Sequence, residues 1–470
     1  PRPWGLRRGT VLARSSTTAL DSPPNYGLPM SGLRHLVSID DLSTGEMNQL
    51  FEHARHFSEN LRDSAETCRG LIAASIFYEP STRTRLSFES AMLRLGGGVL
   101  TAADMTTSSV AKGESLADTV RVVSGAYADI LVLRHPSEGA ARLAAKYSTV
   151  PVINAGDGAH EHPTQTLCDL YTLWIEKGRI EGLNVVLSGD LLYSRTIHSF
   201  VYALARFGAN LVCVPHAGLE LPDYVLKRLR EEFGAEPQAA DASGLGQLAA
   251  SSDVMYIALD PSRQKSGQAQ GAGGLHRIQH VDAVYMTRPQ TERFSSADSD
   301  SDYMTLNAES MSGEALRDAV VMHPLPRRDE IAPEFDADPR SLYFEQAARG
   351  VPIRMAILGM LLGRIDIDAV SPEPRRAVYT VNLPGNPCPN RGCISHTELR
   401  QAPASYRVVS RSPIRAVCSY CSHALEIALV GEVGQQRAMR PDSLGAEQIP
   451  LEGLVFFRGR AEARAAGYAV

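Results

Sequence analysis

The stretch YEPSTRTRLSFES, residues 78–90, gathers anion-binding side chains at the start of a segment with a helical pattern. Its hydroxyl and guanidinium groups belong to Ser81, Thr82, Arg83, Thr84 and Arg85. An ordinary helix N-cap needs only one hydroxyl. The apolar run 71–77 predicts a buried strand just before it. A strand, a turn and a helix N-terminus form a phosphate site, because free backbone N–H groups point at the ligand. The sequence therefore predicts an anion site. The nucleotide P-loop does not match, since its glycines and its Gly-Lys-Ser/Thr ending are absent.

Strand and helix patterns alternate along the chain from residue 34 onward. The apolar strand candidates are residues 71–77, 129–133, 150–153, 183–188, 210–214 and 253–258. Amphipathic segments such as HPTQTLCDLYTLWIEKG and SRTIHSFVYALARFG lie between them. This alternation predicts an α/β fold with doubly wound parallel sheets, in which ligands bind at the carboxyl ends of the strands. Polar clusters do follow strands, at residues 81–85, 134–136 and 189–195.

Two segments interrupt this alternation. Residues 260–280 are rich in Gly and Gln, which predicts a flexible insertion. The insertion is flanked by DVMYIA (253–258) and DAVYMT (282–287), which resemble each other and are expected to compete for one strand position. Residues 366–378 carry two prolines and several charges, which predicts a linker.

The composition is that of a globular protein. A chain of 470 residues has room for two to four domains, and it is 44% hydrophobic and 21% charged. The net charge of −6 shows no signature of polyanion binding, so we expect no nucleic-acid partner. No apolar stretch approaches the ~20 residues that cross a bilayer, so we expect no membrane partner either.

Residues 1–33 form a basic leader. Four arginines stand there against a single acid, Asp21, among several Ser and Thr residues. This composition is typical of an organelle transit peptide, and a disordered leader fits it equally well. We expect a cytoplasmic protein, or a plastid or mitochondrial one if the leader is a transit peptide.

Four of the seven cysteines cluster near the C-terminus, with the spacings Cys388-x4-Cys393 and Cys418-x2-Cys421. Two close pairs of thiolates are typical of a tetrahedral structural zinc site. Two disulfides are the alternative. The other three cysteines are scattered singly, which suggests a reducing compartment and disfavours disulfides.

Seven short segments, taken together and in order, resemble the transcarbamoylases, and among them the catalytic chains of the aspartate type. The segments are PSTRTRLSFE (80–89), AKGESLADT (111–119), RHP (134–136), HPTQ (162–165), RTIHS (195–199), TRPQTER (287–293) and HPLPR (323–327). The resemblance runs from about residue 34 to 365. It implies a carbamoyl phosphate-binding domain at 34–163, completed by a helix at 350–365. It also implies an aspartate-binding domain at 164–349 that contains the insertion.

The tail, residues 379–470, includes NRGCISH and resembles the small β-rich zinc domain of the regulatory chain of aspartate transcarbamoylases, here fused to the catalytic part. The nucleotide-binding domain that precedes this zinc domain in the regulatory chain has no counterpart, because only the short linker lies between. The resemblance thus implies one structural zinc ion, held by Cys388, Cys393, Cys418 and Cys421.

The reaction implied is attack of the L-aspartate amine on carbamoyl phosphate, giving N-carbamoyl-L-aspartate and phosphate, the second step of de novo pyrimidine biosynthesis. By resemblance the catalytic residues are Arg83, Thr84, Arg134 and His162. The carbamoyl phosphate-binding residues implied are Ser81, Thr82, Arg83, Thr84, Ser108, Lys112, Arg134, His162, Gln165, Pro324 and Leu325. The aspartate-binding residues implied are Lys112, Arg195, Arg288 and Gln290. Catalysis in the family needs no cofactor.

In the family the loop with Ser108 and Lys112 crosses into the neighbouring subunit's site. The resemblance therefore implies a homotrimer with shared active sites, and leaves any higher assembly open.

Two alternatives compete with the aspartate-type enzyme, and the first is a transcarbamoylase for ornithine or another amino acid. Ornithine transcarbamoylases typically carry a Cys where Pro324 stands, and an uninterrupted Ser-Met-Gly loop, which ESMSGEAL (309–316) interrupts. Two substrate carboxylates also need planar, permanently charged partners such as Arg195 and Arg288, which would repel a second amine. The other alternative is a non-catalytic paralogue. We would expect it to lose Arg83, Lys112 or Arg288, and all three are present.

Overall fold

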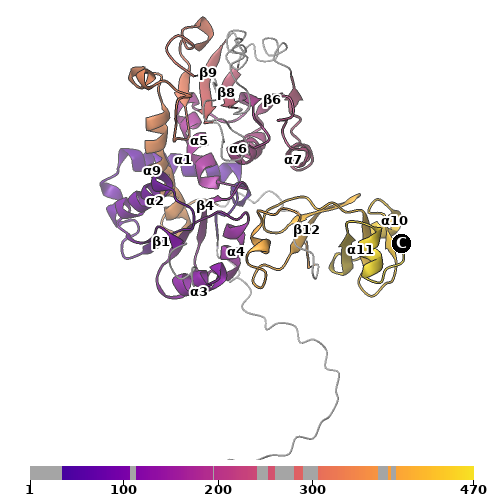
Figure 1. Ribbon diagram of the computed structural model, residues 1–470. Coiled ribbons are helices and arrows are strands. Elements are labelled where there is room, and N and C mark those ends of the chain that lie inside the picture. The colour runs from indigo at the N-terminus through magenta and orange to yellow at the C-terminus, as the bar shows by residue number, and fades with distance from the viewer. Residues whose placement is uncertain are drawn as a thin grey trace, which may run out of the picture.

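The computed structural model describes residues 34–105, 113–193, 195–240, 252–259, 280–288, 305–368, 379–382 and 388–470 (Figure 1). The predicted leader, nearly all of the 260–280 insertion and most of the 366–378 linker lie outside these residues. Among the described residues, no helix is both long and apolar enough to span a bilayer.

The first sheet has four parallel strands in the order β2–β1–β3–β4. These are β1 (Ile72–Phe77), β2 (Gly98–Ala102), β3 (Ile130–His135) and β4 (Val152–Asp157). Its helices are α2 (Thr82–Arg94), α3 (Leu116–Ala126) and α4 (Ala140–Tyr147). All residues of β3 and β4 are buried, which explains why neither strand shows an alternation of apolar and polar residues.

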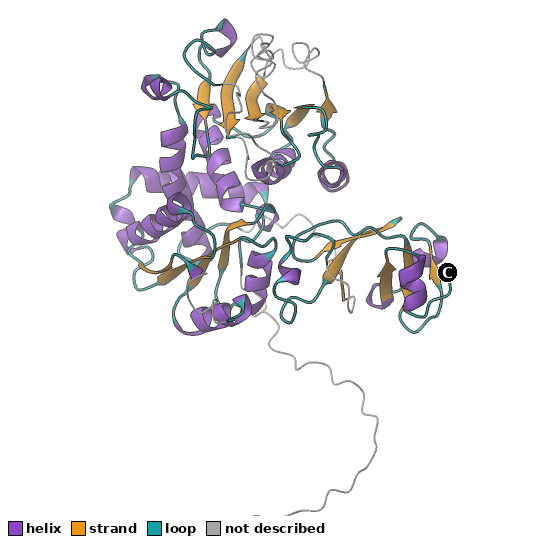
Figure 2. Cartoon of the chain, in the orientation of Figure 1, coloured by secondary structure: helices purple, strands orange, loops and turns teal. Residues whose placement is uncertain are grey.

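The second sheet has six parallel strands in the order β10–β9–β8–β5–β6–β7. These are β5 (Asn184–Gly189), β6 (Asn210–Pro215), β7 (Gln238–Ala239), β8 (Ser252–Ala258), β9 (Val281–Thr287) and β10 (Val320–Met322). Helices α6 (Arg195–Arg206) and α7 (Asp223–Phe233) belong to the same domain. Two parallel sheets flanked by helices confirm the predicted fold class (Figure 2).

The expectation that DVMYIA and DAVYMT compete for one strand position is wrong. They form β8 and β9, which pair in parallel with Tyr256 opposite Tyr285. The two tyrosine rings stack with centroids 4.6 Å apart, and both residues are buried. The two segments resemble each other because each is an inner strand with the same environment, covered on both faces.

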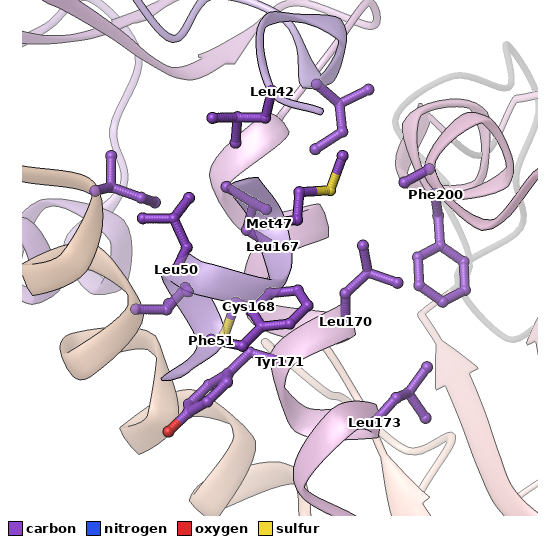
Figure 3. Packing of buried hydrophobic residues seen from close by; sticks show 14 of the residues in the cluster. Leu42, Met47, Leu50, Phe51, Leu167, Cys168, Leu170, Tyr171, Leu173 and Phe200 are labelled. Atoms are coloured by element: carbon purple, nitrogen blue, oxygen red, sulfur yellow. The ribbon is translucent and has the colours of Figure 1, made fainter. Parts of the chain in front are cut away.

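Three helices join the two sheets: α1 (Thr44–Glu59), α5 (Pro163–Lys177) and α9 (Tyr343–Leu361). Figure 3 shows their shared core, in which Met47, Leu50 and Phe51 of α1 lie close to Leu167 and Tyr171 of α5. The helix that we expected at 350–365 is α9, which begins seven residues earlier and ends at Leu361. Because α9 packs against α1, α2 and α5, it fixes one sheet relative to the other.

The tail folds into two small antiparallel sheets, in the orders β11–β12–β13 and β15–β14–β16. Their strands are β11 (Tyr379–Asn382), β12 (Ser405–Arg411), β13 (Ile414–Cys418), β14 (Leu429–Glu432), β15 (Ala438–Met439) and β16 (Leu454–Phe457). Short helices α10 (Leu444–Glu447) and α11 (Arg460–Ala465) complete it. The tail is the β-rich domain that the sequence predicted.

The tail docks against the first sheet's domain through α4 and the loop before it. Arg142 donates to the Tyr420 carbonyl at 3.1 Å, and the Tyr147 hydroxyl donates to the Gln401 carbonyl at 2.9 Å. Apolar side chains of both parts share one buried cluster. Gly139 lies close to the tail: its φ is +81°, and a Cβ there would lie 2.5 Å from the Tyr420 carbonyl carbon.

Gly139→Ala should therefore loosen the tail. A side chain at a left-handed φ costs about 1–2 kcal/mol, and the clash with Tyr420 should add about 1–3 kcal/mol. Limited proteolysis should cleave the tail of this variant faster, and its melting temperature should fall. Gly178→Ala is the matched control, because Gly178 has φ +70° and open space around its Cβ position. Equal losses of melting temperature and of protease resistance in the two variants would show that docking of the tail does not depend on Gly139.

Candidate active site

A cavity of about 760 Å³ lies at the carboxyl ends of strands from both parallel sheets. Residues after β1, β3 and β4 of the first sheet line it, together with residues at the ends of β9 and β10 of the second. Ten of the predicted site residues line this single cavity: Ser81, Thr82, Arg83, Thr84, Arg134, His162, Gln165, Arg288, Pro324 and Leu325.

The N-terminus of α2 faces this cavity without a side-chain cap. Ser81 is its N-cap, yet the Ser81 hydroxyl accepts no hydrogen bond from the helix. Helix α1 shows the ordinary arrangement, in which Ser43 accepts from the backbone N–H of Glu46. The first N–H groups of α2 and the Ser81 hydroxyl are thus left for an anionic ligand. Arg85 does not line the cavity and pairs with Glu89 at 3.4 Å.

Arg134 is the penultimate residue of β3 and is held from two sides. Its Nη1 donates to the Ala155 carbonyl at 3.1 Å, and its Nη2 forms an ion pair with Glu79 at 3.0 Å. Gly156 of β4 makes room for it: at its φ of +114°, a Cβ would lie 2.9 Å from Arg134 Nη1 and 3.3 Å from the His162 ring. A glycine is therefore required where the two side chains meet.

His162 is the N-cap of α5, and its ring nitrogens have different roles. Nδ1 accepts a hydrogen bond from the backbone N–H of Gln165 at 3.3 Å. A neutral imidazole that accepts at Nδ1 carries its proton on Nε2. His162 can therefore offer an N–H donor to an oxygen atom in the cavity.

Gln165 is oriented by a buried carboxylate that the sequence reading missed, Asp169, one turn further along α5. Asp169 Oδ1 accepts from Gln165 Nε2 and from Gln346 Nε2, each at 2.8 Å, and its Oδ2 accepts from the Tyr285 hydroxyl at 2.9 Å. The amide nitrogen of Gln165 is thereby committed to Asp169. Its carbonyl oxygen remains for the cavity, where it can accept an N–H from a ligand.

The same network reaches the loop after β10. Gln346 Oε1 accepts the backbone N–H of His323 at 2.8 Å, and His323 Nδ1 accepts that of Leu325 at 2.8 Å. Leu325 has a φ of +51°, a conformation that is costly for a leucine and is held here by its surroundings. Asp169 thus connects elements of both sheets to one side of the cavity.

Burial raises the pKa of Asp169 to about 6, and its hydrogen bonds from Gln346, Gln165 and Tyr285, with the charge of Arg354, oppose that rise. Burial also lowers the pKa of His323.

The cavity is strongly cationic. Burial and the neighbouring charge of Arg288 lower the pKa of Arg83, so these guanidinium groups, from different domains, face the same space. Arg354 of α9 lines the cavity as well and donates to Ser87 Oγ at 3.0 Å. Such a convergence of cations favours a ligand with several negative charges.

The other predicted substrate-binding residues are not among those that the structure describes in full. Ser108, Lys112 and Gln290 lie outside the described residues, and so does the side chain of Arg195, the first residue of α6. The sequence reading missed several lining residues: Glu79, Ser87, Glu138, Thr287, His323, Gln346 and Arg354. Polar residues at buried positions of the apolar helices α5 and α9 were the signal available for Asp169, Gln346 and Arg354.

The four cysteines of the tail lie together and are buried, and their Sγ atoms are all within 4.8 Å of one another. Cys388 Sγ lies 3.6 Å from Cys421 Sγ, and Cys393 Sγ lies 3.8 Å from Cys418 Sγ. Zn–S bonds of about 2.3 Å in a tetrahedron require Sγ–Sγ distances of about 3.8 Å. The donor set therefore fits a tetrahedral metal ion.

Comparison with known families defines the class. Residues 34–175 match the carbamoyl phosphate-binding domain of aspartate/ornithine carbamoyltransferases, and residues 263–361 match their Asp/Orn-binding domain. Residues 387–428 match the metal-binding domain of the aspartate carbamoyltransferase regulatory chain. The catalytic part is thus a carbamoyltransferase, and the tail is a metal-binding domain.

Individual relatives decide between the aspartate and ornithine types. The catalytic subunit of Thermoplasma acidophilum aspartate carbamoyltransferase is 44% identical over 336 residues, which cover 70% of this chain and 98% of the relative. The solved catalytic subunit from Methanocaldococcus jannaschii is 42% identical, with a TM-score of 0.56, and the match covers 70% of this chain and 98% of that one.

The Trypanosoma cruzi aspartate transcarbamoylase in complex with N-(phosphonacetyl)-L-aspartic acid is 34% identical, with a TM-score of 0.55, over 70% of this chain and 94% of that one. The chain therefore belongs to the aspartate carbamoyltransferase family. The aspartate-type interpretation of the sequence is confirmed.

Asp169 provides a test of this geometry. Asp169→Ala should lower kcat about 10- to 100-fold, because Gln165 and the loop at Leu325 lose their common anchor. Asp169→Asn keeps one oxygen for both glutamine amides and should retain most of the activity.

The pH dependence of stability gives a second readout for Asp169. Since its pKa lies above the unfolded value of 3.8, the native state binds more protons between about pH 4 and pH 6. The free energy of unfolding should fall as pH rises through this window, and Asp169→Asn should remove that part of the fall. Wild-type kinetics in Asp169→Ala would contradict the positioning role.

Proposed function

We propose that the cavity transfers the carbamoyl group of carbamoyl phosphate to L-aspartate, giving N-carbamoyl-L-aspartate and phosphate, in pyrimidine biosynthesis. One observation carries the assignment of this reaction to this cavity. The uncapped N-terminus of α2 with Arg83, and Arg288 from the other domain, face one space, as binding of a phosphate beside a dicarboxylate requires.

The phosphate end binds at α2. Ser81, Thr82 and Thr84, with the first N–H groups of the helix and Arg83, hold the phosphate oxygens. The carbamoyl oxygen gains negative charge as the amine adds to the carbon. Arg134, Thr84 and the Nε2–H of His162 stabilise that charge.

Gln165 accepts an N–H from the carbamoyl nitrogen through its carbonyl oxygen, and the backbone around Pro324 and Leu325 faces the carbamoyl nitrogen and the incoming amine. The amine nitrogen forms a bond to the carbamoyl carbon and loses a proton. The bond from that carbon to the phosphate oxygen breaks, and phosphate leaves with its electron pair. Because two substrates must meet in one geometry, the rigid anchoring of these side chains contributes directly to the rate.

The aspartate carboxylates bind to Arg288, with Arg195, Gln290 and Lys112 as further partners on the basis of the sequence. Arg288→Ala should raise the KM for aspartate about 10- to 100-fold, since loss of a charged hydrogen-bond partner costs about 1.5–3 kcal/mol. Binding of carbamoyl phosphate should stay near normal. Steady-state assays of carbamoyl-aspartate formation measure both, and Arg85→Ala, which lies outside the cavity, is the control. Unchanged aspartate kinetics would remove Arg288 from the site.

We further propose that the chain forms homotrimers whose sites are shared between subunits. The loop with Ser108 and Lys112 follows β2, the edge strand of the first sheet. Exposed apolar side chains lie on α2 and β2: Leu86 is 51% exposed, Leu93 59% and Leu100 45%. Exposed apolar side chains on these two elements are what a contact between subunits would cover.

Mixing inactive Lys112→Ala chains with inactive Arg83→Ala chains tests this arrangement. In a closed ring, some interfaces would combine an intact Lys112 with an intact Arg83, so partial activity should return. The measurement is carbamoyl-aspartate formation after the chains are unfolded and refolded together. Mixed trimers that remain inactive would place each site within one chain.

The metal of the tail is, we propose, zinc bound by its four cysteines. When bound, it supplies folding energy rather than chemistry, since a closed four-thiolate site leaves no open position. Cys418→Ser should lose about one equivalent of zinc by metal analysis, and proteases should then digest the tail while the two parallel-sheet domains stay intact. Full zinc content in this variant would contradict the assignment.

A further inference from the structure

A second cavity, of about 880 Å³, lies between the fused tail and the domain of the second sheet. Helix α7 contributes Tyr224, Lys227 and Arg228 to its wall, and the tail contributes Arg407 of β12 and Arg415 of β13. Its volume falls within the range of small-molecule sites, about 300–1,000 Å³. The proposed transfer reaction uses none of these five side chains.

Arg407 is the unusual member of this wall. Its side chain is partly buried, and its Nε is sealed from solvent without a hydrogen-bond partner. Within the part of the chain that the structure describes, its guanidinium has no ion-pair partner. Burial, with the positive charges of Arg142 and Arg228, lowers the pKa of Arg407 to about 10, and the charges of Asp40 and Glu232 oppose that shift.

Four acids of this region pair with other arginines. Asp40 and Glu232 pair with Arg228, the latter at 3.0 Å. Glu231 pairs with Arg415 at 2.5 Å, and Glu161 lies 3.6 Å from Arg142. Arg142 also donates to Ser422 Oγ at 2.6 Å.

A guanidinium withdrawn from water costs free energy unless an anion or several acceptors compensate it. Among the described residues, Arg407 Nε has no such acceptor, and the cavity that Arg407 lines is large enough to hold an anion.

We propose that this cavity is a binding site for a small phosphate-bearing anion, with Arg407 as its principal ligand. A guanidinium matches two phosphate oxygens with parallel N–H bonds, and Lys227 on α7 adds a second cation of the same wall. Three tyrosines, Tyr193, Tyr202 and Tyr224, also line the cavity. Their rings can pack against an organic group attached to the phosphate. The ligand is therefore either free phosphate or a small phosphate ester.

The position of the site gives it a route to the first cavity. Glu138 and Ala159 line both cavities. His160 and Glu161 line the second, and they directly precede His162 of the first. Asn390 of the tail donates to Glu138 at 2.7 Å. If a ligand in the second cavity changes the affinity of the first cavity for substrate, the substrate changes the affinity for that ligand by the same factor.

The test uses the full chain with the first cavity disabled by Arg83→Ala, so that binding of phosphate at α2 does not interfere. Calorimetric titrations with inorganic phosphate, pyrophosphate and ribose 5-phosphate should each be made on this background and on Arg83→Ala with Arg407→Met. We expect about one equivalent of at least one probe to bind the first protein, and at least tenfold weaker binding to the second. The probe with the highest affinity then distinguishes free phosphate from an ester.

Arg440→Gln on the same background is the matched control, because Arg440 is an exposed arginine of the tail that pairs with Asp442. It should leave binding unchanged. No binding of any probe, or equal affinity with and without Arg407, would overturn the proposal.

Thermal melts of the otherwise wild-type chain provide an independent measurement. Without phosphate, Arg407→Met should melt at the same temperature as wild type or at a higher one, since it removes a charge that lacks a partner. Phosphate should no longer raise its melting temperature through this site.

If the Met variant does not fold, Arg407→Lys keeps the charge, loses the paired geometry, and should still weaken binding. A sharp destabilisation of Arg407→Met in the absence of any anion would show that the protein itself compensates Arg407, and would also overturn the proposal. Carbamoyl transfer should be unchanged in Arg407→Met, so failure here leaves the proposed reaction untouched.

Discussion

The buried carboxylate of Asp169 is the interaction on which the arrangement of the first cavity depends. Two parallel sheets must present the carboxyl ends of their strands to the same space, yet the chain passes between them only through a few helices. Asp169 binds one side chain from each of α5, α9 and β9, and through Gln346 it reaches the loop after β10. A charge buried at this point is costly by itself, and three donors together with the nearby Arg354 offset that cost. Any rearrangement of one sheet against the other would break part of this network.

Much of the architecture could be predicted from the sequence because its signals are local. Apolar runs predicted six strands, and each overlaps an observed one, although the run 150–153 ends four residues before β4 does. The motifs around Arg83, Arg134 and His162 follow strands of a parallel sheet, and ligands bind at the carboxyl ends of such strands. The three residues line one cavity, as this rule predicts. The error over β8 and β9 arose because similar sequences indicate a similar environment and carry no information about whether a sheet has room for both.

The contacts that the sequence could not predict all depend on packing between distant segments. Asp169 lies 177 residues from Gln346, and a single acid in an apolar helix pattern reads as an exposed position. Gly156 reads as a turn glycine, whereas its role is to leave space for Arg134 and His162. The docking of the tail on α4 depends on the fit of Gly139 to Tyr420, which no periodicity reveals. The family resemblance predicted most where several motifs occur in order, and it gave no information on these supporting residues.

The covalent link between the tail and the catalytic part changes how their association responds to concentration. A zinc domain on a separate chain binds by mass action and is lost on dilution, whereas here the contacts of Arg142 and Tyr147 with the tail form within one polypeptide. A tether converts docking into an intramolecular equilibrium governed by an effective concentration that the linker sets, often in the millimolar range. Docking therefore needs only a modest interface of its own, and each catalytic chain carries one tail at any level of expression.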